Sequence, residues 1–127
     1  MVTWMPYWMP ALIFALFIFF MSGQSSPPGA DLAPDYVAHF VVYGVFALTL
    51  LWAVTQGLKK RVTFSRALLC LFISSAYSAT DEIHQSFIPR RNPSWSDIFA
   101  DVLGAATFLL IVLAFAWIRR RRLAAAR

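Results

Sequence analysis

Residues 35–56 read DYVAHFVVYGVFALTLLWAVTQ, an apolar segment whose first turns carry a polar stripe. A helix needs roughly 20 predominantly apolar residues to cross the hydrocarbon core of a bilayer. Asp35, His39 and Tyr43 recur at every fourth position, so they share one face of such a helix. The segment therefore predicts a membrane-spanning helix that carries polar groups inward from one of its ends.

The composition places the whole chain in the membrane class. Its 127 residues are 60% hydrophobic and only 13% charged, whereas ordinary soluble domains carry about 25% charged residues. The chain is long enough for one small helical bundle without a separate soluble domain. Cys70 is the single cysteine, which excludes an intrachain disulfide, and its position in an apolar run predicts a buried packing role.

Four segments are long and apolar enough to span a bilayer. The first competes with a cleaved signal peptide, but no basic residue precedes its apolar run, so a span is favoured. We predict an all-α fold, a four-transmembrane-helix bundle forming a single domain over residues 1–127, with spans at about 4–21, 35–56, 64–87 and 95–118.

The basic residues predict the direction of the bundle. Nine of the eleven lysines and arginines fall on one side of a four-span protein, and they are Lys59, Lys60, Arg61, Arg66, Arg119, Arg120, Arg121, Arg122 and Arg127. The positive-inside rule makes that side cytoplasmic, with both termini on it. The net charge of +5 is thereby explained without a nucleic-acid partner.

The remaining charged groups and both histidines gather in the outward-facing half. They are Asp31, Asp35, Asp81, Glu82, Asp97, Asp101, His39, His84, Arg90 and Arg91. Charged groups within a membrane are costly unless they are paired or hydrated. Helical spacing repeats on the later spans, as Tyr77, Asp81 and either His84 or Gln85, then Asp97, Asp101 and either Gly104 or Ala105. We expect these stripes to face one another around a pocket open to the outside.

Simpler interpretations stay open for several of these residues. Asp35 suits the positive end of a helix dipole, and Asp97 suits a helix start that Ser94 or Ser96 would cap. Arg90 and Arg91 would also fit a solvated loop or contacts with lipid phosphates.

Three blocks of sequence resemble the VanZ-like family over roughly residues 31–108. They are DYVAHFVVYG at 35–44, DEIHQSFIPRR at 81–91 and SWSDIFADVLG at 94–104. The chain departs from the family pattern at three places. Arg90 stands where a small residue, often glycine, precedes the motif arginine, so Arg91 is the better match. Tyr36 replaces a common basic residue, and alanine follows Gly104 where a second glycine is common.

The resemblance implies a multi-pass protein of the bacterial inner membrane that serves the cell envelope and is associated with resistance to the glycopeptide antibiotic teicoplanin. It implies no particular reaction. The first hypothesis is an enzyme that acts on a phosphate-bearing lipid or envelope precursor. Its candidate catalytic residues are His39, Asp81, Glu82, His84 and Asp101, and its candidate ligand-binding residues are Arg91, Arg90, Gln85, Tyr43, Asp35 and Asp97.

These groups would suit a divalent ion, with zinc, manganese and magnesium all open and no tight metal motif present.

The second hypothesis is a non-enzymatic protein that binds a lipid head group, a lipoglycopeptide or another envelope protein. The further alternatives are a small proton-coupled transporter, for which four spans would suffice only in an oligomer, and a purely structural polar network.

Overall fold

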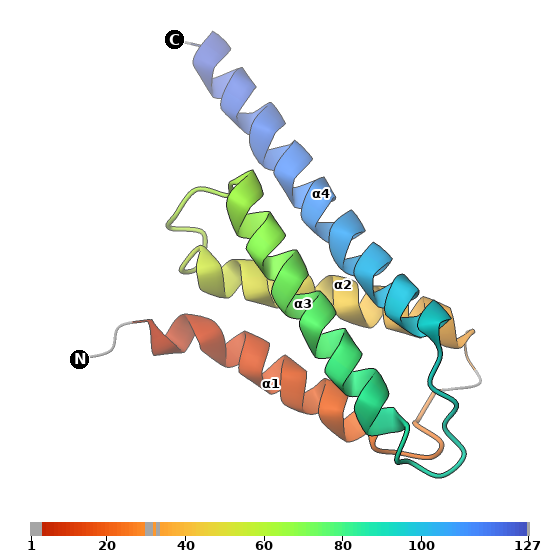
Figure 1. Cartoon of the computed structure of the whole chain (residues 1–127). Coiled ribbons are helices and arrows are strands. Elements are labelled where there is room, and N and C mark those ends of the chain that lie inside the picture. The colour runs from red at the N-terminus through yellow and green to blue at the C-terminus, as the bar shows by residue number, and fades with distance from the viewer. Residues whose placement is uncertain (1–3, 30–31, 33, 127) are drawn as a thin grey trace.

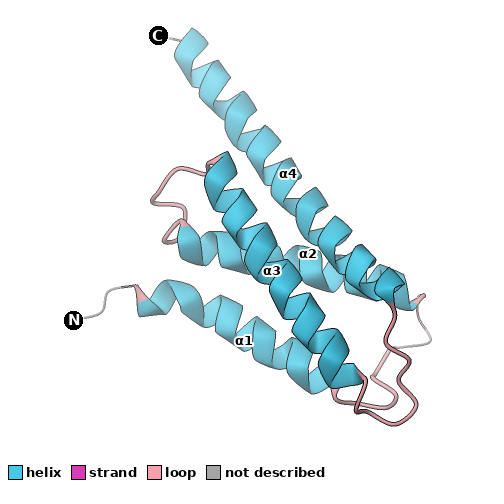
Figure 2. Ribbon diagram, in the orientation of Figure 1, coloured by secondary structure: helices cyan, strands magenta, loops and turns pink. Residues whose placement is uncertain are grey.

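The computed structural model describes residues 4–29, 32 and 34–126, and within them the chain is helical and has no strand (Figures 1 and 2). The helices are α1 (Met5–Ser22), α2 (Asp35–Val54), α3 (Phe64–Gln85) and α4 (Trp95–Ala125). This confirms the predicted all-α fold of four helices. The predicted ends agree within two residues, except that α4 continues through the arginine run.

Three of the described helices, α1, α2 and α4, are long and apolar enough to cross a membrane. The 22-residue α3 would be about 33 Å long at 1.5 Å per residue, which also suffices for the hydrocarbon core. Its lower hydropathy comes from the polar side chains that it buries, namely Ser74, Ser78, Asp81, Glu82 and Gln85. The direction of the bundle and the cytoplasmic location of the termini stay predictions.

Hydroxyl caps define where the two later helices begin. The Thr63 side chain accepts a hydrogen bond from the Arg66 backbone N–H at 3.4 Å, which starts α3. The Ser94 side chain accepts one from the Asp97 backbone N–H at 3.3 Å, which starts α4 as predicted. Each cap satisfies an amide that has no partner inside its helix.

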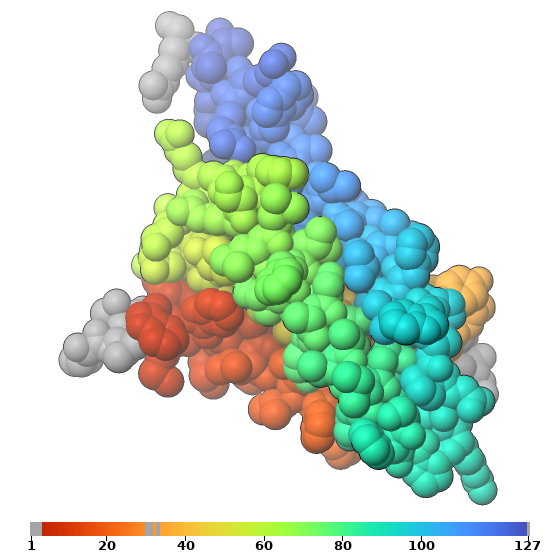
Figure 3. All heavy atoms as spheres, viewed as in Figure 1, coloured from red at the N-terminus to blue at the C-terminus, as the bar shows by residue number. Residues whose placement is uncertain are grey.

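The helices meet at one end of the bundle and spread apart at the other (Figure 1). α2 packs most extensively against α4, and α3 lies against both. The C-terminal part of α4 extends beyond the other helices (Figure 3). α1 is attached by packing on α2 and by the Tyr77 hydroxyl of α3, which donates to the Ala15 carbonyl at 2.7 Å.

The apolar core lies along the inner faces of all four helices, and α1 contributes Ala11 and Ile18 to it. Phe46 and Leu50 of α2 and Leu109 of α4 are each 3% exposed, and Cys70 of α3 is fully buried. The predicted packing role of Cys70 is confirmed. Large apolar side chains cover the outer faces, as expected for helices that face lipid.

A glycine lets α4 approach the backbone of α2. A Cβ atom placed on Gly104 would overlap the carbonyl group of Phe40, with the carbonyl carbon only 2.7 Å away. Backbone cannot move aside as a flexible side chain can, so only glycine fits at this crossing. Small residues have this role in many membrane-helix pairs.

Gly104→Ala is therefore expected to lower the free energy of unfolding by about 1–3 kcal/mol through overpacking. Gly44→Ala is the matched control in α2, because its added Cβ would lie 2.6 Å from the Phe108 side chain, which can move by a change of χ1 as a backbone carbonyl cannot. Thermal unfolding in detergent, followed by tryptophan fluorescence, should show the larger loss for Gly104→Ala. Equal tolerance of both changes would contradict the close helix crossing.

Candidate functional site

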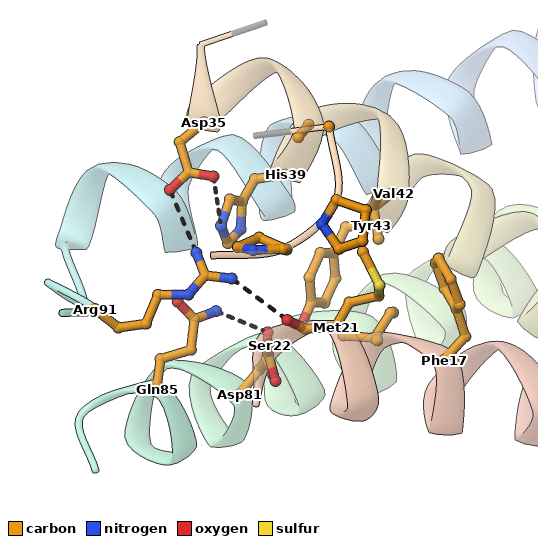
Figure 4. Close-up of a pocket in the computed structure, with 15 residues that line it drawn as sticks. Phe17, Met21, Ser22, Asp35, His39, Val42, Tyr43, Asp81, Gln85 and Arg91 are labelled. Carbon is orange, nitrogen blue, oxygen red and sulfur yellow. Dashed lines mark hydrogen bonds and ion pairs between the residues drawn. The ribbon is translucent and has the colours of Figure 1, made fainter. Parts of the chain in front are cut away.

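The end where the helices meet contains a pocket of about 230 Å³ (Figure 4). The ends of α1 and α3 and the starts of α2 and α4 lie here, together with the two loops that join them. Part of the lining is polar, and it consists of Ser22, Asp35, His39, Tyr43, Asp81, Gln85 and Arg91. The rest is mainly apolar and includes Phe17, Ile18, Met21, Ala38 and Val42. The pocket is thus amphipathic.

A buried histidine–aspartate pair joins α2 to α4 beside this pocket. His39 Nδ1 lies 2.9 Å from Asp101 Oδ1, and the side chains are 10% and 1% exposed. Ser78 of α3 donates its hydroxyl to Asp101 Oδ2 at 2.6 Å. With Asp101 ionised, the hydrogen between His39 and Asp101 belongs to Nδ1, because a carboxylate can only accept. The Asp101 carboxylate therefore connects three helices and fixes the orientation of the His39 ring.

Arg91, in the loop before α4, is held in the pocket by the end of α1. Its Nε donates to the Gln24 carbonyl at 3.0 Å, and its Nη2 donates to the Met21 carbonyl at 3.5 Å. Its Nη1 lies 3.9 Å from Asp35, whose side chain is 63% exposed (Figure 4). That separation exceeds the length of a strong charge-assisted hydrogen bond, which is about 2.7–2.9 Å. The guanidinium is fixed in place but only weakly neutralised.

The structure separates the roles of the two neighbouring arginines. Arg90 is exposed and has a φ of +67°, in the left-handed region that favours glycine. This backbone angle explains physically why a small residue would suit this position. Arg91 points into the pocket, with only 12% of its side chain exposed. Of the two arginines, Arg91 is the one placed to bind a ligand.

Two further acids of α3 are buried at the same end. Asp81 accepts a hydrogen bond from the Gln85 side chain at 3.2 Å, one turn along the same helix. Glu82 Oε2 accepts one from the Ser94 backbone N–H at 3.0 Å, which ties α3 to the start of α4. Glu82 Oε1 and the Tyr43 hydroxyl are buried and have no hydrogen-bond partner among the described residues. Both atoms are therefore available to a bound group.

His84 does not join this cluster. Its ring stacks on Phe19 of α1 with centroids 4.4 Å apart, and its Nδ1 lies 3.1 Å from the Ser22 hydroxyl. Its neighbour Gln85 is the side chain that faces the pocket. The catalytic role predicted for His84 stays a prediction, and the contacts observed here attach α3 to α1.

The bundle thus brings most of the predicted site residues to one end. The pocket is lined by Asp35, His39, Tyr43, Asp81, Gln85 and Arg91, and the buried groups behind them are Glu82, Asp97 and Asp101. The carbonyl groups of Met21 and Gln24 that bind Arg91 could not be predicted, because backbone carbonyls occur at every residue. The contribution of α1 to the pocket wall was also left undecided by the sequence.

The acids and His39 form two overlapping groups with the separations of metal ligands. One ligand atom each from His39, Glu82 and Asp101 lie within 4.8 Å of one another, and all three residues are buried. His39 also forms such a group with Asp35 and Asp97. The site therefore has a histidine and several carboxylates for a cation, and one fixed guanidinium for an anion.

A family model described as VanZ/LLP1 matches residues 35–117, about two thirds of the chain. The match covers α2, α3 and most of α4, and so includes His39, Glu82, Arg91 and Asp101. α1, which supplies an apolar wall of the pocket, lies outside the matched segment. No curated protein and no solved structure matches the chain.

Asp101→Ala would leave the buried His39 without its acid, and breaking a buried pair typically costs about 3–5 kcal/mol. Ser78→Ala removes one hydrogen bond to the same carboxylate, for which about 1.5–3 kcal/mol is expected. Thr80→Ala is the control on α3, because its exposed hydroxyl bonds only the nearby Tyr77 carbonyl and its loss should cost under about 0.5 kcal/mol.

Thermal unfolding of the three variants in one detergent should give this order of stability loss, with circular dichroism reporting whether each variant retains its helical content. Three similar melting temperatures would contradict the connecting role of Asp101.

Proposed function

The chain belongs to the VanZ/LLP1 family, and from that premise we propose that it binds a phosphate-bearing membrane lipid or lipid-linked envelope precursor in the pocket beside Arg91. The observation that carries the proposal is the set of contacts made by the Arg91 guanidinium. Two carbonyl groups of the α1 end hold it, and its one acidic neighbour lies 3.9 Å away. A phosphate can take up the remaining donors, because the guanidinium fork matches phosphate oxygens.

The other acids near Arg91 do not compete strongly for it. Asp101 is paired with His39 and Ser78, Glu82 accepts a backbone hydrogen bond, and Asp81 accepts from Gln85. Asp35 is mostly exposed and can turn toward solvent when an anion enters. The charge of the site therefore does not prevent phosphate binding.

The apolar part of the pocket favours a lipid over a free phosphate. Phe17, Ile18 and Met21 of α1 and Val42 of α2 line the wall beside the polar groups. An acyl or prenyl chain would lie along these side chains while its head group meets Arg91. Burial of each methylene would contribute about 0.8 kcal/mol.

The distribution of basic residues predicts the side of the membrane on which the pocket lies. The positive-inside rule directs the Lys59–Arg61 loop and the arginines of α4 to the cytoplasm of a bacterial inner membrane. The opposite end, with the pocket, would then face outward, where lipid-linked envelope precursors are used. A link to teicoplanin resistance would follow from altered handling of such a precursor.

We expect Arg91→Gln to weaken binding of dodecyl phosphate to the purified protein by about 10-fold or more, since hydrogen bonds to charged groups contribute about 1.5–3 kcal/mol. Asp35→Asn should strengthen binding by up to about 5-fold, because it removes an exposed acid that competes for Arg91. Isothermal titration calorimetry in a non-ionic detergent measures both changes.

Arg122→Gln is the matched control, since it removes one exposed positive charge from the far end of α4. It should leave the affinity unchanged, and dodecyl trimethylammonium should not bind at the pocket. Equal losses in Arg91→Gln and Arg122→Gln would contradict a defined phosphate site and indicate general attraction of anions to a basic protein.

The His39–Asp101 pair favours a second candidate, an enzyme that acts on the same lipid. A histidine oriented by a buried carboxylate is the arrangement that proton transfer requires. Release of phosphate or transfer of the head group by the purified protein would support this candidate, provided that His39→Gln abolishes turnover while phosphate-lipid binding persists. Binding without turnover by the unmodified protein would leave the first candidate.

A further inference from the structure

We propose that His39, Glu82 and Asp101 form a buried binding site for a divalent cation, manganese or zinc, behind the wall of the pocket that His39 lines. The site joins three helices, because its residues come from α2, α3 and α4. The inference goes beyond lipid binding, since a cation would occupy these groups whether or not a lipid is present.

The distances fit a coordination sphere. One nitrogen and two carboxylate oxygens from the three residues lie within 4.8 Å of one another. His39 Nδ1 and Asp101 Oδ1 are 2.9 Å apart. Two ligand atoms with metal bonds of about 2.1 Å are separated by about 3 Å at the right angles of six-coordinate manganese, and by about 3.4 Å at the tetrahedral angle of zinc. A cation can therefore replace the hydrogen between His39 and Asp101 without a large movement of either side chain.

Each carboxylate is anchored on its outer side. Asp101 Oδ2 accepts from the Ser78 hydroxyl at 2.6 Å, and Glu82 Oε2 accepts from the Ser94 backbone N–H at 3.0 Å. Donors of this kind orient the ligands of known metal sites. In each case the second oxygen is left for the interior of the cluster.

An unsatisfied oxygen points to a missing positive group. Glu82 is only 6% exposed, and its Oε1 is buried without any hydrogen-bond partner among the described residues. Burying an unpaired carboxylate oxygen is costly, so such atoms normally meet a donor or a metal ion. The position of Glu82, within reach of His39 and Asp101, makes a cation the simplest partner.

The charge of the surrounding groups also calls for a cation. Asp35 and Asp97 form the second ligand group around His39, so four acids surround a single histidine. The nearest fixed cation, Arg91, is bonded to carbonyl groups of the α1 end and is 3.9 Å from Asp35. A divalent ion would offset much of the repulsion among these carboxylates.

The donor set selects the type of ion. Calcium and magnesium prefer sites made only of oxygen atoms, whereas imidazole together with carboxylates suits zinc and manganese. The ion would bind Nδ1 of the neutral imidazole, whose one ring hydrogen then lies on Nε2. Protons compete with the ion for the imidazole and the carboxylates, so affinity should fall as the pH is lowered. With a metal bound, His39 acts as a ligand and not as a proton-transfer group.

The test measures manganese binding to the full-length protein in a non-ionic detergent free of phospholipid, by elemental analysis after dialysis and by titration. We expect about one bound manganese ion per chain and an affinity at least ten-fold lower in Glu82→Gln. Asp81→Asn is the matched control, since it neutralises the adjacent buried acid of α3, which belongs to neither ligand group among the described residues. It should bind manganese within about three-fold of the unmodified protein, because its charge acts only at a distance.

Electron spin-echo spectroscopy of the unmodified protein adds a readout that does not depend on the folding of a variant. It should detect coupling of the manganese spin to a histidine nitrogen. Absence of bound metal, equal losses in Glu82→Gln and Asp81→Asn, or bound manganese without nitrogen coupling would each overturn the proposal. Failure of dodecyl phosphate binding would leave this result unaffected, because no phosphate-bearing molecule is present in the assay.

Discussion

The buried contact between His39 and Asp101 is the interaction on which the polar end of the bundle depends. It becomes possible because Gly104, one turn beyond Asp101, allows α4 to reach the α2 backbone at Phe40, the residue after His39. A larger residue at 104 would separate the helices and draw the carboxylate away from the imidazole. Packing and polar chemistry are thus coupled at one crossing, and Ser78 extends the coupling to α3.

Because the four helices meet at this end, the pocket has a polar wall and an apolar wall. α2, α3 and the loop before α4 supply most of the polar side chains, while α1 contributes Ser22 and the apolar Phe17, Ile18 and Met21. α1 also fixes Arg91 through the carbonyl groups of Met21 and Gln24. A ligand with a charged head and an apolar tail fits this division. A cation among the carboxylates behind His39 would add a second positive group near the pocket.

The length of the apolar segments was sufficient to predict the four helices, and helical periodicity was sufficient to place Asp35, His39 and Tyr43 on one face. It left His84 and Gln85 as alternatives, because adjacent residues differ by about 100° around a helix. The packing of α3 against α1 turns His84 toward Phe19 and Gln85 toward the pocket. The backbone partners of Arg91 could not be predicted, since no residue type identifies a carbonyl group that will be free. The left-handed backbone at Arg90 likewise depends on the path of the loop.

Solid-state nuclear magnetic resonance of the protein in bilayers, with nitrogen-15 in its arginine guanidinium groups and phosphorus-31 in the lipid, tests the central claim most directly. The claim is that Arg91 binds a lipid phosphate within the pocket. It predicts phosphorus–nitrogen dephasing from an ordered arginine that disappears in Arg91→Gln and persists in Arg122→Gln. Identical dephasing in the unmodified protein and in Arg91→Gln would contradict it and would place the lipid phosphates at the other arginines.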